Sequence, residues 1–116
     1  MKKLKSKLIN YTSNLARGDI LRCKGMWPYE ELVDFMVVEV STEGKMSYSL
    51  LVASGYKAGL IFSKLPEESI PVGDEGYAVS INWLKDSWME WGYFECPLEE
   101  VYVLENLPPS DLSAPI

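Results

Sequence analysis

Residues 33–40 read VDFMVVEV, a valine-rich run with the length and composition of a β-strand that is buried on most of both faces. Residues 41–45 read STEGK, a turn in which Gly44 can take the positive φ that a hairpin requires. Residues 46–53, MSYSLLVA, then form the second strand. This hairpin decides the fold, because every other segment must pack against it or pair with it.

More strands are expected on both sides of this hairpin. Residues 56–63 read as a third strand, which would continue the hairpin into an antiparallel meander. Shorter strands are expected at residues 20–23, 77–81 and 101–104. The sheet should therefore contain about five or six strands.

A short amphipathic helix is predicted between Asn82 and Gly92. Leu84, Trp88 and Trp91 recur at positions i, i+4 and i+7, which places them on one helix face. Asn82 is a plausible N-cap, and Gly92 stands where a helix commonly ends. Trp88 and Trp91 are expected in the core, because a helical stripe of large apolar side chains is usually buried.

Near the N-terminus, Leu4, Leu8, Tyr11 and Leu15 follow spacings of four, three and four residues, which would line one face of another helix. The elements together predict an α+β domain that is mainly antiparallel β. Its sheet is either twisted or closed into a partly open barrel, with the one Trp-rich helix packed on it. Residues 1–106 are expected to form a single globular domain, and residues 107–116 a flexible Pro-rich tail.

The composition of the 116 residues argues against most catalytic chemistry. The chain has no histidine, so Ser-His-Asp and Cys-His catalysis and His-ligated metal sites are excluded. Cys23 and Cys96 stand alone, without a CxxC motif, which argues against a zinc site or a redox pair. We therefore expect no catalytic residue, no metal and no cofactor. No apolar run approaches the ~18 residues of a membrane span, and we expect a cytoplasmic protein.

Charge is distributed very unevenly along the chain. Residues 1–24 carry seven bases and one acid, whereas the residues from Gly25 onward carry four lysines and sixteen carboxylates. An acidic surface of this size repels nucleic acid and anionic membranes and attracts a basic protein partner. The alternative is that the acidic charge only keeps the domain soluble.

The residues proposed to bind such a partner are of two kinds. The carboxylates come from the acidic loop between residues 64 and 76 and from the polar side of the predicted helix, where they would steer a basic partner. Two tryptophans outside the buried helix stripe would anchor it. The set is Trp27, Glu67, Glu68, Asp74, Glu75, Trp83, Asp86 and Glu90.

Four stretches together resemble a known class of protein. They are GDILRCKG at residues 18–25, VDFM at 33–36, WLKDSWMEW at 83–91 and VYVLE at 101–105. In this order they resemble small bacterial immunity proteins of polymorphic-toxin and contact-dependent growth inhibition systems. The resemblance implies a cytoplasmic antitoxin-like protein that binds and occludes the toxic domain of a delivered effector, often a nuclease, without catalysis. Because such proteins diversify at their interfaces, it assigns no binding residue.

Two other functions fit the residues. One is a small-ligand-binding or regulatory β-barrel whose interior, or whose loop around Trp27, receives an apolar molecule. The other is a hydrolase that uses a pair of carboxylates, and this is the weakest of the three interpretations.

Overall fold

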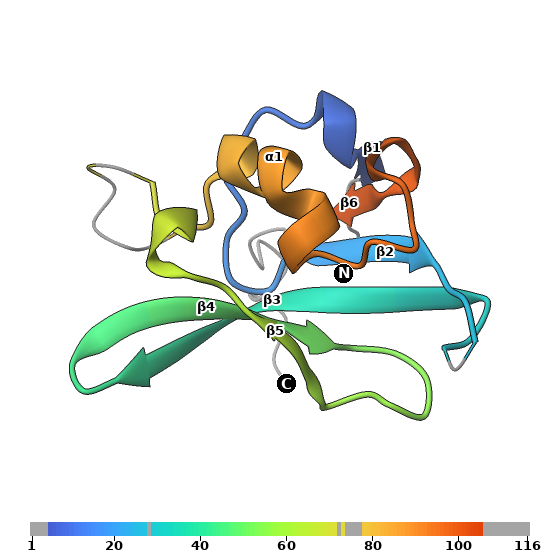
Figure 1. Cartoon of the computed structure of the whole chain (residues 1–116), viewed down its shortest axis with the longest axis horizontal. Coiled ribbons are helices and arrows are strands. Elements are labelled where there is room, and N and C mark those ends of the chain that lie inside the picture. The colour runs from blue at the N-terminus through green and yellow to red at the C-terminus, as the bar shows by residue number, and fades with distance from the viewer. Residues whose placement is uncertain (1–4, 28, 72, 74–77, 106–116) are drawn as a thin grey trace, which may run out of the picture.

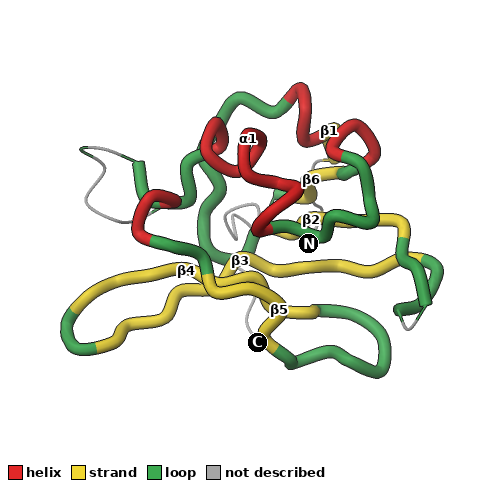
Figure 2. Tube along the Cα trace, in the orientation of Figure 1, coloured by secondary structure: helices red, strands yellow, loops and turns green. Residues whose placement is uncertain are grey.

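The computed structural model describes residues 5–27, 29–71, 73 and 78–105. Among these residues it contains six strands, one α-helix and three 3-10 helices (Figures 1 and 2). In chain order they are β1 (Lys5–Lys7), η1 (Leu8–Asn10), β2 (Ile20–Lys24), β3 (Leu32–Thr42), β4 (Lys45–Val52), β5 (Ile61–Lys64), η2 (Glu67–Ser69), α1 (Ile81–Trp91), η3 (Leu98–Glu100) and β6 (Tyr102–Leu104). The predicted tail at residues 107–116 lies outside the described residues.

The strands form one sheet in the order β1-β6-β2-β3-β4-β5, and each described pairing is antiparallel. The sheet is twisted and does not close, while α1 and the 3-10 helices η1 and η3 lie over one of its faces (Figure 1). This is the predicted α+β class, in the form of a twisted sheet and not of a barrel. The predicted meander is present as β3-β4-β5, with β2 paired to the outer side of β3.

The hairpin forms where the sequence predicts it. β3 and β4 pair from Phe35 opposite Val52 to Thr42 opposite Lys45. The two residues between them have positive φ, with Glu43 at 53° and Gly44 at 77°. Positive φ at both central positions matches the twist of the flanking strands.

One feature of β3 differs from the prediction. Val33, Phe35 and Val37 are fully buried, but Asp34 and Met36 on the other side of the strand are only half-buried. The strand is thus buried on one face, because the helices cover one face of the sheet (Figure 1).

The third strand is shorter than predicted. β5 begins at Ile61, and the residues before it form tight turns in which Gly55 and Gly59 have φ of 73° and 100°. The backbone N–H of Gly59 donates to the carbonyl of Val52 at 2.7 Å, which closes the connection just beyond β4. Glycine at these positions avoids the strain that another residue would have there.

The N-cap of helix α1 lies two residues earlier than predicted. The N-cap is Ser80, whose side-chain oxygen accepts a hydrogen bond from the backbone N–H of Trp83 at 3.2 Å. Asn82, predicted as the N-cap, is an exposed residue of the first turn. The helix ends before Gly92, as expected, and a Cβ at this glycine would collide with the Trp88 indole.

The strand predicted at residues 77–81 is wrong. Among its described residues, Val79 forms only an isolated antiparallel bridge with Leu15, with backbone hydrogen bonds of 2.8 and 2.9 Å. Residue 81 already belongs to α1. This bridge and the hydrogen bond from the Ile81 N–H to the Asn14 side-chain oxygen at 3.0 Å hold the start of the helix against the N-terminal segment.

The predicted N-terminal helix is also wrong. Lys5–Lys7 pairs with β6 as an edge strand, and one 3-10 turn follows. Leu8, Tyr11 and Leu15 are nevertheless buried, so their spacing did mark residues of the core. Pairing with a strand from the other end of the chain overrides the weak helical propensity of this segment.

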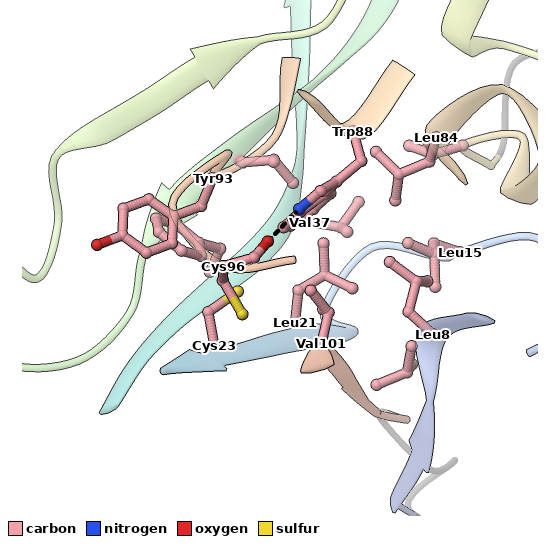
Figure 3. Packing of buried hydrophobic residues seen from close by; sticks show 14 of the residues in the cluster. Leu8, Leu15, Leu21, Cys23, Val37, Leu84, Trp88, Tyr93, Cys96 and Val101 are labelled. Carbon is pink, nitrogen blue, oxygen red and sulfur yellow. Dashed lines mark hydrogen bonds between the residues drawn. The ribbon is translucent and has the colours of Figure 1, made fainter. Parts of the chain in front are cut away.

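The core lies between α1 and the sheet, and Trp88 is its largest fully buried side chain (Figure 3). The indole Nε1 donates a buried hydrogen bond to the backbone carbonyl of Cys96 at 2.8 Å. Trp91, the other tryptophan predicted in the core, is half-buried and packs at the edge of the cluster. The helix stripe is therefore core at Leu84 and Trp88 and becomes the rim of the core at Trp91.

Candidate functional site

Four of the predicted partner-binding carboxylates lie on two elements that pack together. Glu67 and Glu68 are exposed on η2, and Asp86 and Glu90 are exposed on α1. We call these four residues the α1–η2 acidic surface. The two remaining predicted carboxylates, Asp74 and Glu75, lie outside the described residues.

Backbone contacts join the two elements of this surface. The N–H of Ser80, the cap of α1, donates to the carbonyl of Ser69 in η2 at 2.7 Å. The hydroxyl of Ser69, a buried residue, donates to the carbonyl of Pro66 at 2.6 Å and closes the 3-10 turn. These contacts place η2 beside the start of α1.

The carboxylates of the α1–η2 acidic surface form no ion pair with any described residue. Lys85 is the one base on α1, but its Nζ donates to the backbone carbonyls of Ile9 and Tyr11 at 3.1 and 2.7 Å. Its charge is directed toward the N-terminal segment. Lys85 therefore does not pair with Asp86 or Glu90, whose carboxylates face solvent and can interact with a partner.

Trp83 borders the acidic surface but is not a free anchor. Its side chain is half-buried, and its ring lies 6.3 Å from that of Trp91 with an angle of 43° between the planes. Part of the ring packs against the core, so only the remainder is available to a partner.

Trp27 lies elsewhere on the molecule. It is 90 % exposed, in the loop of residues 25–31 between β2 and β3. This loop lies at the right of Figure 1, whereas η2 lies at the left. The predicted site residues thus form two separate groups, one acidic at α1 and η2 and one aromatic at the β2–β3 loop.

A surface hollow of about 760 Å³ opens behind the Trp27 loop, and the sequence analysis did not find it. Lys7, Arg22 and Lys24 line it together with carboxylates of the loop and of η3. Arg22 is held by two hydrogen bonds from its guanidinium to Asp34, at 2.8 and 2.9 Å, and these hydrogen bonds raise the pKa of Arg22. No local sequence pattern indicates the hollow, because its lining residues come from segments that only the pairing of the strands brings together.

Neither cysteine has the exposure of a reactive thiol. Cys23 and Cys96 are free and buried. Burial raises the pKa of the Cys23 thiol, and the neighbouring Cys96 raises it further. A neutral buried thiol is inert, because the thiolate is the reactive form.

Two further findings concern the described residues. No group of three or more of their Cys, Asp and Glu side chains is placed to hold a metal ion. None of their helices has the length and apolar character that crossing a membrane requires.

A family model for immunity protein 45 matches residues 8–103, which run from η1 to β6 and include both groups of predicted site residues. The chain belongs to the immunity protein 45 family. This confirms the resemblance to bacterial immunity proteins, a class whose general role is to neutralise toxins by binding them. Neither a curated protein nor a solved structure matches the chain. The hypothesis of a carboxylate hydrolase has no support from the family match.

Proposed function

We propose that this immunity protein binds the toxic domain of a bacterial effector in the cytoplasm and occludes its active site, without catalysing any reaction. The observation that carries the proposal is the family match over residues 8–103. The composition supports a non-catalytic mechanism, since the chain has no histidine and the Cys23 thiol is buried. The effector would belong to a polymorphic-toxin or contact-dependent growth inhibition system.

The partner surface is proposed to be basic. The α1–η2 acidic surface presents four exposed carboxylates that no described base neutralises, with the rim of Trp83 beside them. Asp74 and Glu75 are proposed to extend this charge. A toxin that cleaves nucleic acid has a basic surface where it binds the phosphate backbone, and carboxylates can take the places of those phosphates. A nuclease is therefore the toxin that this charge pattern fits best.

The function is tested with the toxin domain encoded next to the gene for this chain. Both proteins are purified, and the activity of the toxin on DNA and RNA is measured with increasing amounts of the immunity protein. We expect stoichiometric inhibition that needs no metal beyond what the toxin requires. A toxin that stays fully active at a several-fold excess of this chain would contradict the proposal. Turnover of a nuclease, esterase or glycosidase substrate by this chain alone would contradict the non-catalytic mechanism.

Charge reversal on the α1–η2 acidic surface tests the role of its carboxylates. The variants Glu67→Lys with Glu68→Lys, and Asp86→Lys with Glu90→Lys, should slow association about ten-fold or more, because steering by charge acts on the on-rate. Folding should be unaffected, since the side chains are exposed. Glu43→Lys, in the β3–β4 turn, is the control and should have little effect.

Salt gives a second measurement of the same charge. The Debye length falls from ~10 Å at 0.1 M to ~3 Å at 1 M, so the on-rate of the parent protein should fall with salt more than its off-rate changes. Stopped-flow kinetics measures both rates. If all three reversals behave alike and salt has no effect, the charge serves solubility only, and the acidic surface is not the steering element.

Small-ligand binding is the second candidate function, and the hollow of about 760 Å³ is the observation that favours it. Charged side chains of both signs are among those that line it, so the screen covers charged ligands. A thermal-shift screen of charged metabolites would detect such a ligand as a rise in melting temperature that Lys24→Ala abolishes.

A further inference from the structure

Trp27 has an unusual environment for its side chain. It is 90 % exposed, and its neighbour Met26 is 53 % exposed, although tryptophan is one of the largest apolar residues. Tryptophan is also the residue most enriched among side chains that dominate the affinity of protein interfaces. Exposing the apolar surface of an indole to water is unfavourable, and a partner that buries the ring gains this free energy on binding.

The backbone of the loop that carries Trp27 is fixed by hydrogen bonds. The N–H of Gly25 donates to the carbonyl of Glu31 at 2.8 Å, and the N–H of Tyr29 donates to the carbonyl of Met26 at 2.8 Å. A Cβ at Gly25 would collide with the carbonyl of Glu30. The loop is closed so tightly that only glycine fits at its first residue.

A cluster of aromatic rings packs against the same loop. The rings of Tyr29, Phe35, Phe62 and Tyr93 pack together, with centroids between 4.7 and 6.4 Å apart. The hydroxyl of Tyr93, just beyond α1, accepts a hydrogen bond from the N–H of Met26 at 2.9 Å. The four rings come from β3, from β5, from the loop itself and from the segment just beyond α1.

The β4–β5 connection holds the loop from the other side. The carboxylate of Glu30 accepts a hydrogen bond from the backbone N–H of Tyr56 at 3.2 Å, and the Lys57 ammonium lies 5.9 Å from the centre of the Tyr29 ring. A flexible loop would lose entropy on binding, whereas a loop held on three sides has little left to lose. The fold thus holds Met26 and Tyr29, on either side of Trp27, by contacts with other segments.

We infer that Trp27 is the anchor of the toxin interface and inserts into an apolar pocket on the toxic domain whose rim is basic. The basic rim is argued from the exposed carboxylates of Glu31, on the same loop, and Glu95, two residues after the supporting Tyr93. The inference rests on the proposed function and extends it, because it places the anchoring contact at the β2–β3 loop and not at Trp83. The α1–η2 acidic surface then affects how fast the partner arrives, and Trp27 how long it stays.

The test is the affinity of Trp27→Ala for the purified toxin domain encoded beside the gene. We expect the Kd to rise at least about 30-fold, which corresponds to ~2 kcal/mol, and mainly through a faster off-rate. Trp27→Phe should recover part of the loss because it restores a ring. Ile9→Ala, which shortens an exposed apolar side chain on η1, is the control and should leave the Kd within about two-fold.

Fluorescence provides an independent readout in the same proteins. The exposed indole should emit as tryptophan does in water, and its emission should shift to shorter wavelength when the toxin domain binds. Trp27→Phe should lack this shift. Gly25→Ala keeps the indole but disturbs the loop, so it should also weaken binding, and circular dichroism must show that it is folded.

The outcomes separate the inference from the proposed function. If the parent protein inhibits the toxin and Trp27→Ala binds as tightly as the parent, the anchor inference is wrong and the immunity function stands. If the parent does not bind the toxin, the function itself fails. If Trp27→Ala instead converts a self-associated protein to a monomer without changing toxin affinity, the loop binds a second copy of this chain, and the inference is wrong.

Discussion

Trp88→Ala should be among the most destabilising single substitutions in this protein. The side chain is 1 % exposed between α1 and the sheet, and its Nε1–H is bound to the carbonyl of Cys96 at 2.8 Å (Figure 3). Replacing a buried tryptophan by alanine leaves a large void that costs about 3 to 5 kcal/mol. The carbonyl of Cys96 loses its donor as well, which adds about 1 kcal/mol or more.

The sum, about 4 to 6 kcal/mol, is a large part of the stability of a small domain, which is commonly ~5 to 15 kcal/mol. Each kcal/mol lowers the melting temperature of a domain of this size by roughly 4 °C, so a decrease of about 15 to 25 °C is expected. The assay is urea and thermal unfolding followed by circular dichroism, since removing an indole alters fluorescence directly. Trp88→Phe should lie between parent and alanine variant, because it keeps a ring and loses the hydrogen bond.

The same substitution at an exposed position is the matched control. Trp27→Ala removes an identical side chain that is 90 % exposed, so its unfolding free energy should stay within about 0.5 kcal/mol of the parent. If Trp88→Ala melts within a few degrees of Trp27→Ala, the assignment of Trp88 to the core is wrong. The indole stripe of α1 would then be available for stacking on a ligand or partner.

Two further predictions concern titratable side chains. Burial raises the pKa of Tyr29 and of Tyr93 above the ordinary value of 10.0, with Glu95 also raising both, so the unfolded chain loses these protons first. Their contribution to stability should therefore be constant up to about pH 9 and fall as the pH rises through 10. The phenolate absorbance of the folded parent that Tyr29→Phe and Tyr93→Phe remove should appear only above that pH, and its appearance at or below pH 10 would contradict this. Burial also raises the pKa of the Cys23 thiol, so this cysteine should not react with a disulfide reagent at pH 8 until the protein is unfolded, and rapid reaction in the native protein would show that the site opens.

The central part of the fold could be predicted because its signals are local. The hairpin of β3 and β4 is encoded by adjacent valine-rich and apolar runs and by Gly44 between them, and α1 by the spacing of Leu84 and Trp88. Neither depends on distant residues for its register or its face. The burial of Trp88 follows from the same periodicity, since a stripe of large apolar residues must be covered.

Two segments were predicted wrongly because their structure depends on distant partners. Lys5–Lys7 is a strand because it pairs with β6, near the other end of the chain. Val79 forms an isolated bridge with Leu15, which is 64 residues earlier in the chain. In both segments the local pattern marked correctly which residues are buried, but not the backbone conformation that buries them.

The candidate site shows the same division. The exposure of the carboxylates on α1 and η2 followed from composition and helix spacing. The Trp27 loop could be predicted as open, but not as rigid, because its rigidity comes from Tyr93 beyond α1 and from Tyr56 in the β4–β5 connection. Because the contacts that hold the loop come from other segments, the sequence of the loop itself does not indicate them.

The arrangement of the bases sharpens the charge argument. Arg17 forms an ion pair with Glu39 at 2.6 Å, and Arg22 forms one with Asp34 at 2.8 Å. The ammonium of Lys85 is bound to backbone carbonyls near the N-terminus. These cations act within the fold: Arg17 and Arg22 bind carboxylates of β3, and Lys85 joins α1 to the N-terminal segment. None of these three bases pairs with the α1–η2 acidic surface, so none of them lowers its negative field by a direct contact. A basic partner is attracted by these carboxylates as it approaches, which raises the rate of association. This arrangement is expected of an immunity protein that must bind its toxin quickly.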